Sequence, residues 1–377
     1  MEIIHLILGK ANPERMNGVN KVVHEMATNQ ELQGYPVQVW GITAHPDHDY
    51  PDRIFTTRLF PACRNPFRLH RTLKQAFLDY KGRIVVHIHG AFIPVFYTVS
   101  RFLDCHQIPF IITPHSTYNR VMMKKNALRK KIYFRFFERS LLDRSSCIHL
   151  LGKSEWFGLH DIYNNKKSII LPYGFTRNQA KPVPEKANGF YVVYCGRFAM
   201  HHKGLDILLE GFALFNRKYP DARLILVGDG SEKERLRELC WLLGIDASVT
   251  FMGSVFGKDK TRILQECHVF AHPSRTDGLP ATIVEASSLG LPCVISEATN
   301  MGELVERYDA GYTMKSLDAD EFDRGLTIMY NRIVRGGEGQ LLQANACSMI
   351  DKVFSWPLIL GHFNTIYRAS LQSFKKA

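Results

Sequence analysis

Two cations in the second half of the chain have the types and spacing to bind a diphosphate. Arg197 follows the apolar run "YVVYCG", and Lys203 precedes a helical pattern that begins near Gly204. A strand end beside a helix N-terminus offers free N–H groups and partial positive charge. Arginine can bind two phosphate oxygens at once, and lysine adds a compact charge. The pair therefore predicts a diphosphate site, with a solvated basic loop as the alternative.

Two carboxylates follow in the stretch "DGLPATIVE". Asp277 begins a turn through Gly278 and Leu279, Pro280 suits a helix start, and Glu285 falls in the second turn of that helix. A carboxylate can accept hydrogen bonds from two hydroxyls, as a ribose diol or a sugar ring presents them. The N–H groups of the turn would complete the diphosphate site. The alternative is that one acid caps a turn and the other is merely solvated.

These residues need a scaffold of buried strands, and the chain provides short apolar runs separated by helical patterns. Strands are predicted in both halves, at 2–8, 36–42, 83–88, 109–113, 147–151 and 168–171, then at 190–196, 222–228, 248–253, 268–272 and 292–296. Helices are predicted between them, including 19–33, 94–106, 204–218, 231–243, 258–266 and 280–289. This alternation predicts an α/β protein with two tandem, doubly wound Rossmann-like domains. The polar, proline-rich segment 172–189 is the predicted linker.

Doubly wound sheets bind ligands outside the carboxyl ends of their strands. If two such edges face each other, they enclose one cleft, which is a common place for a small-molecule site. We therefore expect the charged residues of the second half to face a cleft between the domains.

Taken together, these stretches resemble the retaining family-four glycosyltransferases of the GT-B fold. The family signature is a Gly-Arg turn with a downstream lysine, then an acidic residue and a glutamate separated by seven positions. Here it reads Gly196-Arg197, Lys203, Asp277 and Glu285, with aspartate where the family usually has glutamate. Further similar runs include "LILVGDGSEKERL", "VTFMGSV", "NMGELVE" and "ILPYGF". The resemblance covers nearly the whole chain.

The resemblance also implies roles in the first half. The family's glycine loop corresponds to "MNGVNK", where Asn17-Gly18 stands in place of two adjacent glycines and Gly18 would lie near the donor. His115, in "ITPHSTYN", would lie near the reacting sugar as a catalytic residue. His89 and Gly90, in "VHIHGAF", would shape the acceptor pocket.

The family implication for domains is an acceptor-binding domain at 1–175 and a donor-binding domain at 186–356. A final helix, about 357–377, would cross back to the first domain. The implied reaction moves a hexose from a nucleotide diphosphate sugar and keeps its anomeric configuration. Arg197 and Lys203 would stabilise the leaving diphosphate, while Asp277 would bind the transferred sugar and Glu285 the ribose. The implied acceptor is a lipid-linked glycan of a bacterial surface polysaccharide; a small soluble sugar is the alternative.

We expect no metal ion and no cofactor beyond the sugar nucleotide. Asp-x-Asp, the pattern of metal-bound donors, occurs at 47–49 in a polar loop and at 318–320 at a predicted helix start. Neither follows a strand. The eight cysteines form no C-x-x-C pair, which argues against a zinc site.

The net charge of +12 comes from the first half. Residues 1–182 hold 26 Lys/Arg against 13 Asp/Glu, whereas 183–377 hold 22 against 23. The segment 120–144 concentrates nine cations against two acids, interleaved with aromatic residues. It predicts a surface that docks on an anionic membrane, with these candidate contacts: Lys124, Lys125, Arg129, Lys130 and Lys131.

A nucleic-acid-binding module is the competing class, because basicity and aromatic residues permit it. It would leave the four charged residues of the second half unexplained. No apolar run approaches the roughly 20 residues that span a bilayer, and "MEIIHLILGK" does not have the pattern of a signal peptide. We expect a cytoplasmic protein, peripheral on the inner face of the membrane, without a nucleic-acid partner.

Overall fold

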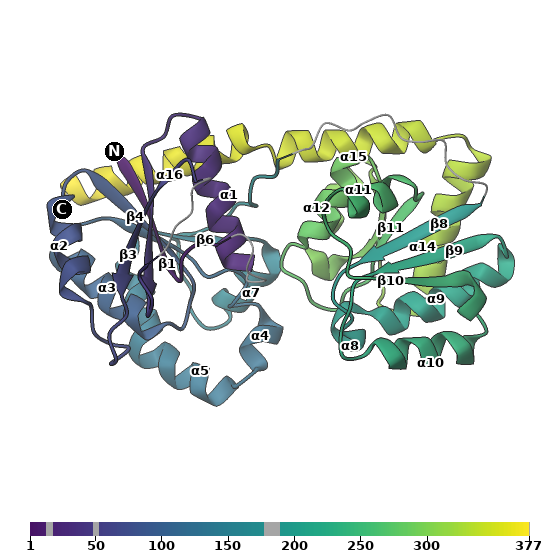
Figure 1. Ribbon diagram of the computed structural model, residues 1–377, viewed down its shortest axis with the longest axis horizontal. Helices are drawn as coiled ribbons and strands as arrows, with labels where there is room; N and C mark the ends of the chain where they lie inside the picture. The colour runs from purple at the N-terminus through teal and green to yellow at the C-terminus, as the bar shows by residue number, and fades with distance from the viewer. Residues whose placement is uncertain (13–17, 48–52, 177–188, 377) are drawn as a thin grey trace. The chain divides into compact units, whose positions relative to one another are not determined.

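The computed structural model describes residues 1–12, 18–47, 53–176 and 189–376, which form two compact units (Figure 1). The first unit holds Met1–Gly174 together with Trp356–Ala377, and the second holds Phe175–Ser355. Most of the predicted linker, 177–188, lies outside the described residues.

The first unit is built on a seven-stranded parallel sheet in the order β3-β2-β1-β4-β5-β6-β7. Its strands are β1 Glu2–Leu8, β2 Val37–Thr43, β3 Thr56–Pro61, β4 Ile84–His89, β5 Phe110–Thr113, β6 Cys147–Leu150 and β7 Ser168–Ile170. Its helices are α1 Gly18–Leu32, α2 Arg71–Asp79, α3 Pro94–Cys105, α4 Arg120–Lys124, α5 Ala127–Tyr133, the π-helical turn η1 Phe134–Glu138, α6 Arg139–Arg144, α7 Lys153–His160 and α16 Trp356–Lys376.

The second unit has a six-stranded parallel sheet in the order β10-β9-β8-β11-β12-β13. Its strands are β8 Phe190–Cys195, β9 Ala222–Val227, β10 Val249–Gly253, β11 Val269–His272, β12 Cys293–Ser296 and β13 Gly311–Met314. Its helices are α8 Met200–Lys203, α9 Leu205–Lys218, α10 Lys233–Leu243, η2 Asp246–Ser248, α11 Gly257–Gln265, α12 Ala281–Ser288, η3 Glu297–Thr299, α13 Gly302–Arg307, α14 Ala319–Tyr330, η4 Asn331–Arg335 and α15 Gly339–Val353.

Each sheet is buried on both faces, which explains the near-continuous apolar strands. In β1, Ile4 and Leu6 belong to one core cluster, while Ile3 and Ile7 belong to another on the opposite face. The last helix, α16, contributes Phe363 to the latter cluster and packs against β4 and β5 (Figure 1). The prediction of two doubly wound α/β domains is confirmed.

Two strands were missed by the sequence pattern, β3 and β13, and both lie at the edge of their sheet. β3 reads "TTRLFP" with only Phe60 buried, so it lacks an apolar run. β13 has four residues and begins at Gly311. An edge strand is covered less than a central one, and its residues are correspondingly more polar.

The unit boundaries differ from the predicted domains by one residue at the end of the first domain and at the start of the last helix, whereas the second unit begins at Phe175 rather than at 186. Phe175 belongs to the second unit, because its N–H donates to the carbonyl of Phe354 and it bridges Ser355. Trp356 belongs to the first unit, because its side chain is buried in the cluster around β1 and lies against Gly174.

Among the helices that the structure describes, none combines the length and the apolar character needed to cross a membrane.

Candidate functional site

The second unit brings its predicted site residues to the point where its strand order reverses. β8 and β11 are neighbours there, with β9 and β10 on one side and β12 and β13 on the other. Arg197 follows the carboxyl end of β8, and Asp277 follows that of β11. This switch point is where doubly wound sheets leave a crevice for ligands.

Lys203 and Asp277 are in direct contact, although 74 residues separate them. The ammonium Nζ lies 2.5 Å from Asp277 Oδ2, and both side chains are largely buried. The buried ring of His272 binds the same oxygen through Nε2 at 2.9 Å. One carboxylate oxygen is therefore shared by a cation and an imidazole.

This contact keeps Asp277 ionised. Burial by itself would raise the pKa of the Asp277 carboxyl, but the hydrogen bond from His272 and the charge of Lys203 outweigh it and hold the pKa at about 2. Burial lowers the pKa of His272, against the effect of Asp277. The site therefore presents a fixed negative charge beside a fixed positive one.

Tight backbone packing holds Lys203 next to Asp277. Gly204 has φ +66°, and a Cβ at this position would lie 2.0 Å from the carbonyl oxygen of Pro273, so only glycine fits. Ser274 donates to the carbonyl of His202, at 3.1 Å. The sequence placed Lys203 in the segment before the helix near Gly204, where no helix was predicted. The structure shows that it ends the short helix α8, whose last turn packs on the segment after β11.

A bidentate ion pair closes the same segment from the other side. Arg275 binds both carboxylate oxygens of Asp206, at 2.7 and 2.8 Å. Asp206 lies in the first turn of α9. Such planar pairs fix orientation as well as distance. The loop that carries Asp277 is thus tied to α8 and α9 before any ligand binds.

Arg197 is exposed, and within the described ranges its guanidinium makes no salt bridge. Its charge, with those of Lys203 and Asp277, acts on His202. Arg197 thus shares the neighbourhood of the Lys203–Asp277 pair and keeps its charge accessible.

Glu285 is paired with a residue that sequence reasoning missed. Lys260, on α11, lies with Nζ 2.7 Å from Glu285 Oε2 on α12, and both are mostly buried. Both also influence the pKa of Cys195 at the end of β8, which burial raises to about 11. Glu285 therefore faces the carboxyl end of β8, as Asp277 and Arg197 do.

The turn between the two acids leaves donors available. Pro280 is the N-cap of α12, as the sequence predicted. The side chain of Asn300 donates to the backbone carbonyls of Asp277 and Gly278. In the part of the chain that the structure describes, no hydrogen bond uses the N–H groups of Gly278 or Leu279. These N–H groups suit an anionic ligand.

In the first unit, His115 follows β5 in a left-handed conformation, with φ +55°, and Ser116 has φ +63°. Non-glycine residues adopt this region rarely, and it recurs at functional sites. The His115 ring is hydrogen-bonded to the hydroxyl of Tyr173 at 2.8 Å and to the ring of His89 at 3.0 Å. The strained turn is thus held through the side chain of its histidine.

The expectation for His89 needs correction. Its side chain is 1% exposed, and its ring nitrogens bond to His5 at 2.8 Å and to His115 at 3.0 Å. The ring therefore contacts His115 rather than an acceptor pocket, so His89 acts behind His115.

Gly90 and Gly18 differ in what they require. Gly90 has φ +127°, and a Cβ there would meet Ile93 at 2.7 Å, so glycine is needed for the turn. Gly18 is the exposed first residue of α1 with no atom near its Cβ position. Its role near the donor stays a prediction, because 13–17 lie outside the described residues.

Two family models match the chain. Residues 16–154 match Glycosyltransferase Family 4, and residues 175–332 match Glycosyl transferases group 1. The chain is a family-four glycosyltransferase. Both matches coincide with the units that carry His115 and the Lys203–Asp277 pair.

Curated relatives of this glycosyltransferase are distant. An uncharacterized glycosyltransferase of Haemophilus influenzae is 33% identical over 131 residues, 34% of this chain and 36% of that protein. Mannosylfructose-phosphate synthase of Agrobacterium fabrum is 26% identical over 63% of this chain and 60% of its own length. An Escherichia coli enzyme, UDP-Gal:alpha-D-GlcNAc-diphosphoundecaprenol alpha-1,3-galactosyltransferase, is 24% identical over 76% of both. The chain thus matches about a third of the first relative and three fifths of the second.

Solved structures agree on the GT-B fold. Sucrose-phosphate synthase from Thermosynechococcus elongatus superposes with a TM-score of 0.74, at 18% identity, over all of both chains. HepE from Anabaena, solved with UDP, gives 0.71 at 17% identity, also over all of both chains. Identity this low shows the fold alone.

Sequence reasoning missed His272 and Lys260 in the glycosyltransferase. His272 ends a strand, as His89 does, so the same signal could have found it. Lys260 lies on a helix of mixed charge, "GKDKTRILQ", and carries no local signal.

One of the two Asp-x-Asp patterns lies wholly within the described residues. Asp318 caps α14, accepting from the N–H of Glu321 at 2.8 Å, as predicted for a helix start. Asp47 is described but Asp49 is not. Within the described ranges, the cluster with metal-ligand geometry is formed by three buried histidines, His5, His87 and His89.

A buried carboxyl group beside the loop after β4 gives a pH prediction. Glu138 Oε1 accepts from Tyr118 Oη at 2.6 Å and from the N–H of Phe92 at 3.0 Å. Burial raises the pKa of Glu138 to about 7, although these two bonds lower it. Between pH about 4.5 and 7 the folded chain therefore holds a proton that the unfolded chain has lost, so stability falls as the pH rises through this window.

Glu138→Gln should flatten this slope, by up to about 1.4 kcal/mol per pH unit. Its thermal midpoint should exceed that of the parent chain at pH 8 and approach it at pH 5, as scanning calorimetry would measure. Asp143 is a matched control, because this exposed carboxylate also accepts a tyrosine hydroxyl, from Tyr163 at 2.6 Å. If Asp143→Asn and Glu138→Gln gave the same slope, the assignment to Glu138 would fail.

Proposed function

We propose that this glycosyltransferase moves a hexose from a nucleoside diphosphate sugar to a hydroxyl of a lipid-linked glycan, with retention of the anomeric configuration and without a metal ion. The observation that carries the proposal is the Lys203–Asp277–His272 contact at the switch point of the second unit. It sets one cation and one carboxylate next to an accessible guanidinium at Arg197.

Each group suits one part of the donor. Arg197 and the N–H groups of Gly278 and Leu279 can bind the diphosphate. The ionised Asp277 can accept from hydroxyls of the transferred sugar, and Glu285 from the ribose diol. When the donor binds, Lys203 can divide its hydrogen bonds between Asp277 and a phosphate oxygen, since an ammonium carries three donors.

The proposed reaction breaks the bond between the anomeric carbon and the phosphate oxygen. The acceptor hydroxyl oxygen bonds to that carbon on the same face, and its proton passes to the departing phosphate. Lys203 and Arg197 stabilise the charge that develops on the nucleoside diphosphate. The site supplies position and charge rather than a nucleophile.

The lipid-linked acceptor is supported by the undecaprenol-linked substrate named for the Escherichia coli relative. The second candidate, a small soluble sugar, is supported by the mannosylfructose-phosphate synthase relative. A soluble acceptor would need no membrane surface on the protein.

One experiment tests the activity and the acceptor class together. The purified chain is screened by thermal shift against UDP-, GDP- and ADP-hexoses, and the stabilising donor is incubated with extracted lipid acceptors or with free sugars. Mass spectrometry should detect one added hexose on the lipid acceptor, with the same yield in EDTA. Product on free sugars alone would select the second candidate, and loss of product in EDTA would reject the metal-independent mechanism.

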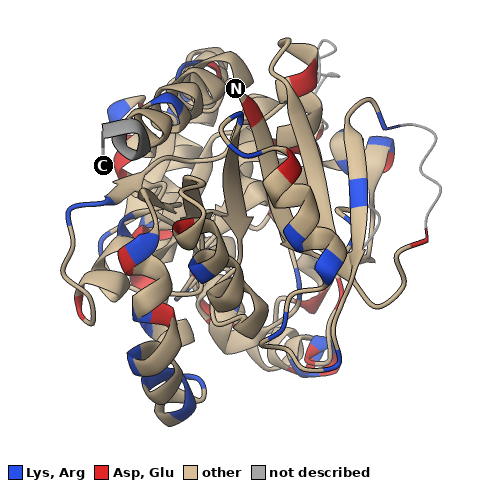
Figure 2. Ribbon diagram, turned by 90° about the vertical axis from the view of Figure 1, so that its left-hand side faces the viewer, with Lys and Arg blue, Asp and Glu red and all other residues tan. Residues whose placement is uncertain are grey.

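The basic segment 120–144 supports membrane docking in part. It folds as α4, α5, η1 and α6, and most of its cations are exposed. Apolar side chains on the same segment are exposed too, such as Leu128, 71% exposed, and Phe136, 64%. Phe134 instead packs in the core. Figure 2 shows Lys and Arg positions along the helix that projects at the bottom of the view.

One of the five predicted contacts, Lys130, is turned inward. Its ammonium donates to the carbonyl of Met122 at 2.6 Å and lies 5.5 Å from the centre of the Phe92 ring. Burial and the charge of Lys125 lower its pKa. Lys130 therefore joins α4 to α5, while the other four candidates are exposed: Lys124, Lys125, Arg129 and Lys131.

Anionic liposomes should sediment the chain at low salt, and neutral liposomes should not, because each cation near the surface contributes about 1 kcal/mol. Leu128→Ser with Phe136→Ser should weaken binding. Trp241→Ser with Leu242→Ser is the matched control, since these residues are 71% exposed on α10 of the second unit. Equal sedimentation with both lipids would reject docking.

A further inference from the structure

The core of the first unit contains five histidines joined by hydrogen bonds through shared partners. They come from the strands β1, β4 and β6 and the loop after β5, and all five have a pKa lowered by burial: His5, His87, His89, His115 and His149. Each ring is therefore neutral, with one N–H and one bare nitrogen. Which nitrogen carries the proton is decided by the partners.

At one end of this network, the direction of the hydrogen bond is fixed. His149 Nε2 lies 2.7 Å from the carbonyl oxygen of Leu171, which can only accept, so Nε2 carries the proton. His149 Nδ1 is then bare and must accept from the hydroxyl of Thr113, at 2.7 Å. Because Thr113 has one proton to give, it accepts from His87 Nε2, at 2.6 Å.

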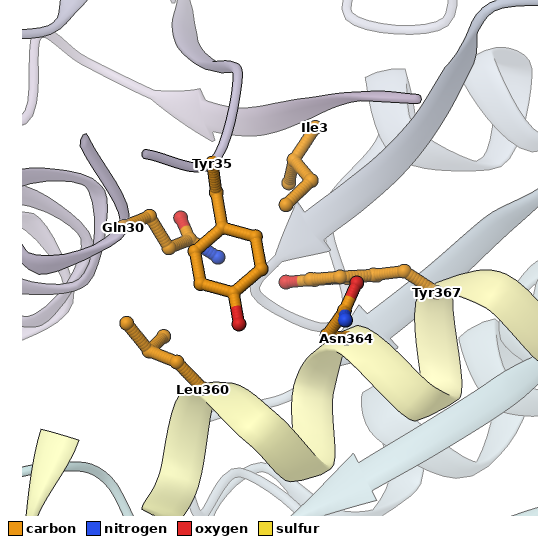
Figure 3. Close-up of a pocket in the computed structure, with 6 residues that line it drawn as sticks. All are labelled: Ile3, Gln30, Tyr35, Leu360, Asn364 and Tyr367. Carbon is orange, nitrogen blue, oxygen red and sulfur yellow. The ribbon is translucent and has the colours of Figure 1, made fainter. Parts of the chain in front are cut away.

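The same logic carries the assignment to α16. His87 Nδ1 is bare, so the hydroxyl of Tyr367 donates to it, at 2.8 Å. Figure 3 shows the Gln30 amide and the Tyr367 hydroxyl on the facing sides of one small pocket.

Gln30, on α1, orients the second branch. Its amide oxygen faces His5 Nε2 at 2.6 Å, so that nitrogen carries the proton and His5 Nδ1 is bare. His89 Nε2 must then donate to His5, at 2.8 Å, and His89 Nδ1 must accept from His115 Nε2, at 3.0 Å. His115 Nδ1 is left as an acceptor, and it receives the hydroxyl of Tyr173 at 2.8 Å.

We infer that the hydrogen bonds that run from the Gln30 amide oxygen through His5 and His89 hold His115 in the Nε2–H tautomer and present its bare Nδ1 to a hydroxyl. In the free protein that hydroxyl belongs to Tyr173. A sugar hydroxyl of the substrate takes its place when the site is occupied, so His115 accepts a hydrogen bond and donates none toward the sugar. The last step rests on the proposed function; the tautomer does not.

A metal ion does not fit the same three central histidines as they stand. Each ring nitrogen of His5, His87 and His89 already has a hydrogen-bond partner at 2.6 to 3.0 Å. The rings of His87 and His89 stack with centroids 4.1 Å apart. A metal would have to replace those bonds and turn the rings toward one centre.

The test is the protonation state of His115 in the full chain, read without substrate. Histidine is labelled with ¹⁵N, long-range ¹H–¹⁵N spectra are recorded, and His115 is assigned by its absence in His115→Gln. A single species with protonated Nε2 and bare Nδ1 is expected. A protonated Nδ1, a mixture of tautomers, or stoichiometric metal on the histidines would overturn the inference, whatever reaction the protein catalyses.

Gln30→Met and Gln38→Met form a matched pair, because both glutamines are buried in the first unit and each change removes one carboxamide. Gln30→Met leaves His5 Nε2 without its acceptor, so His115 should shift to a tautomer mixture; kcat should fall about 10-fold with the donor KM unchanged. Gln38→Met should alter neither. An unchanged His115 spectrum in Gln30→Met, or in Gln30→Asn if the former does not fold, would overturn the inference.

Discussion

Lys203→Ala is expected to lower kcat/KM for sugar transfer by about 10²–10³-fold, the loss that follows removal of one group stabilising transition-state charge. The physical reason is the position of the ammonium, which lies 2.5 Å from Asp277 at the switch point where a departing diphosphate would gain charge. Steady-state kinetics with the donor found by thermal shift would measure the effect.

The fold should survive this change, because Asp277 keeps the hydrogen bond from His272, at 2.9 Å. Lys218 provides a matched control. Its ammonium lies 2.5 Å from Asp323 in the same unit, as Lys203 lies from Asp277. Lys218→Ala removes a comparable ion pair away from the switch point and should leave kcat/KM near that of the parent chain. Equal losses in the two variants would mean that an ion pair is needed for stability alone.

The meeting of Lys203 and Asp277 was predictable because it depends on strand order. Both residues follow carboxyl ends of parallel strands, and β8 and β11 became neighbours by the ordinary doubly wound topology. The buried strands were equally predictable, since apolar runs such as "FYVVYC" are typical of strands that are buried on both faces. Edge strands such as β3 were not predictable, because a partly exposed strand has no continuous apolar run.

Contacts between helices were beyond the sequence. Lys260 and Glu285 are 25 residues apart on α11 and α12, and no periodic pattern connects them. The role of His89 was misjudged for a related reason. A histidine at a strand end gives the same sequence pattern whether its ring faces a ligand or another buried ring. Gln30 lies on α1 with no local signal at all, and its importance follows only from its contact with His5.

Glu285→Ala should nearly abolish transfer, lowering kcat/KM by about 10²-fold or more, because the variant would lose the proposed hydrogen bonds to the ribose and would leave Lys260 without its carboxylate. A hydrogen bond to a charged group contributes about 1.5–3 kcal/mol, and an unpaired, mostly buried ammonium adds to the loss. The change should appear mainly as weaker donor binding, measured as a raised donor KM or a lost thermal shift.

Lys260→Met separates the two contributions. If Glu285 binds the ribose directly, Glu285→Ala should cost more than Lys260→Met, and the double variant should resemble Glu285→Ala alone. Glu266→Ala is the surface control, since it breaks an exposed ion pair with Arg262, 2.8 Å, at the end of α11. If Glu285→Ala bound the donor as tightly as the parent chain, the ribose would have to bind elsewhere. If Lys260→Met lost more donor affinity than Glu285→Ala, the ligand contact would belong to the lysine, and the glutamate would only orient it.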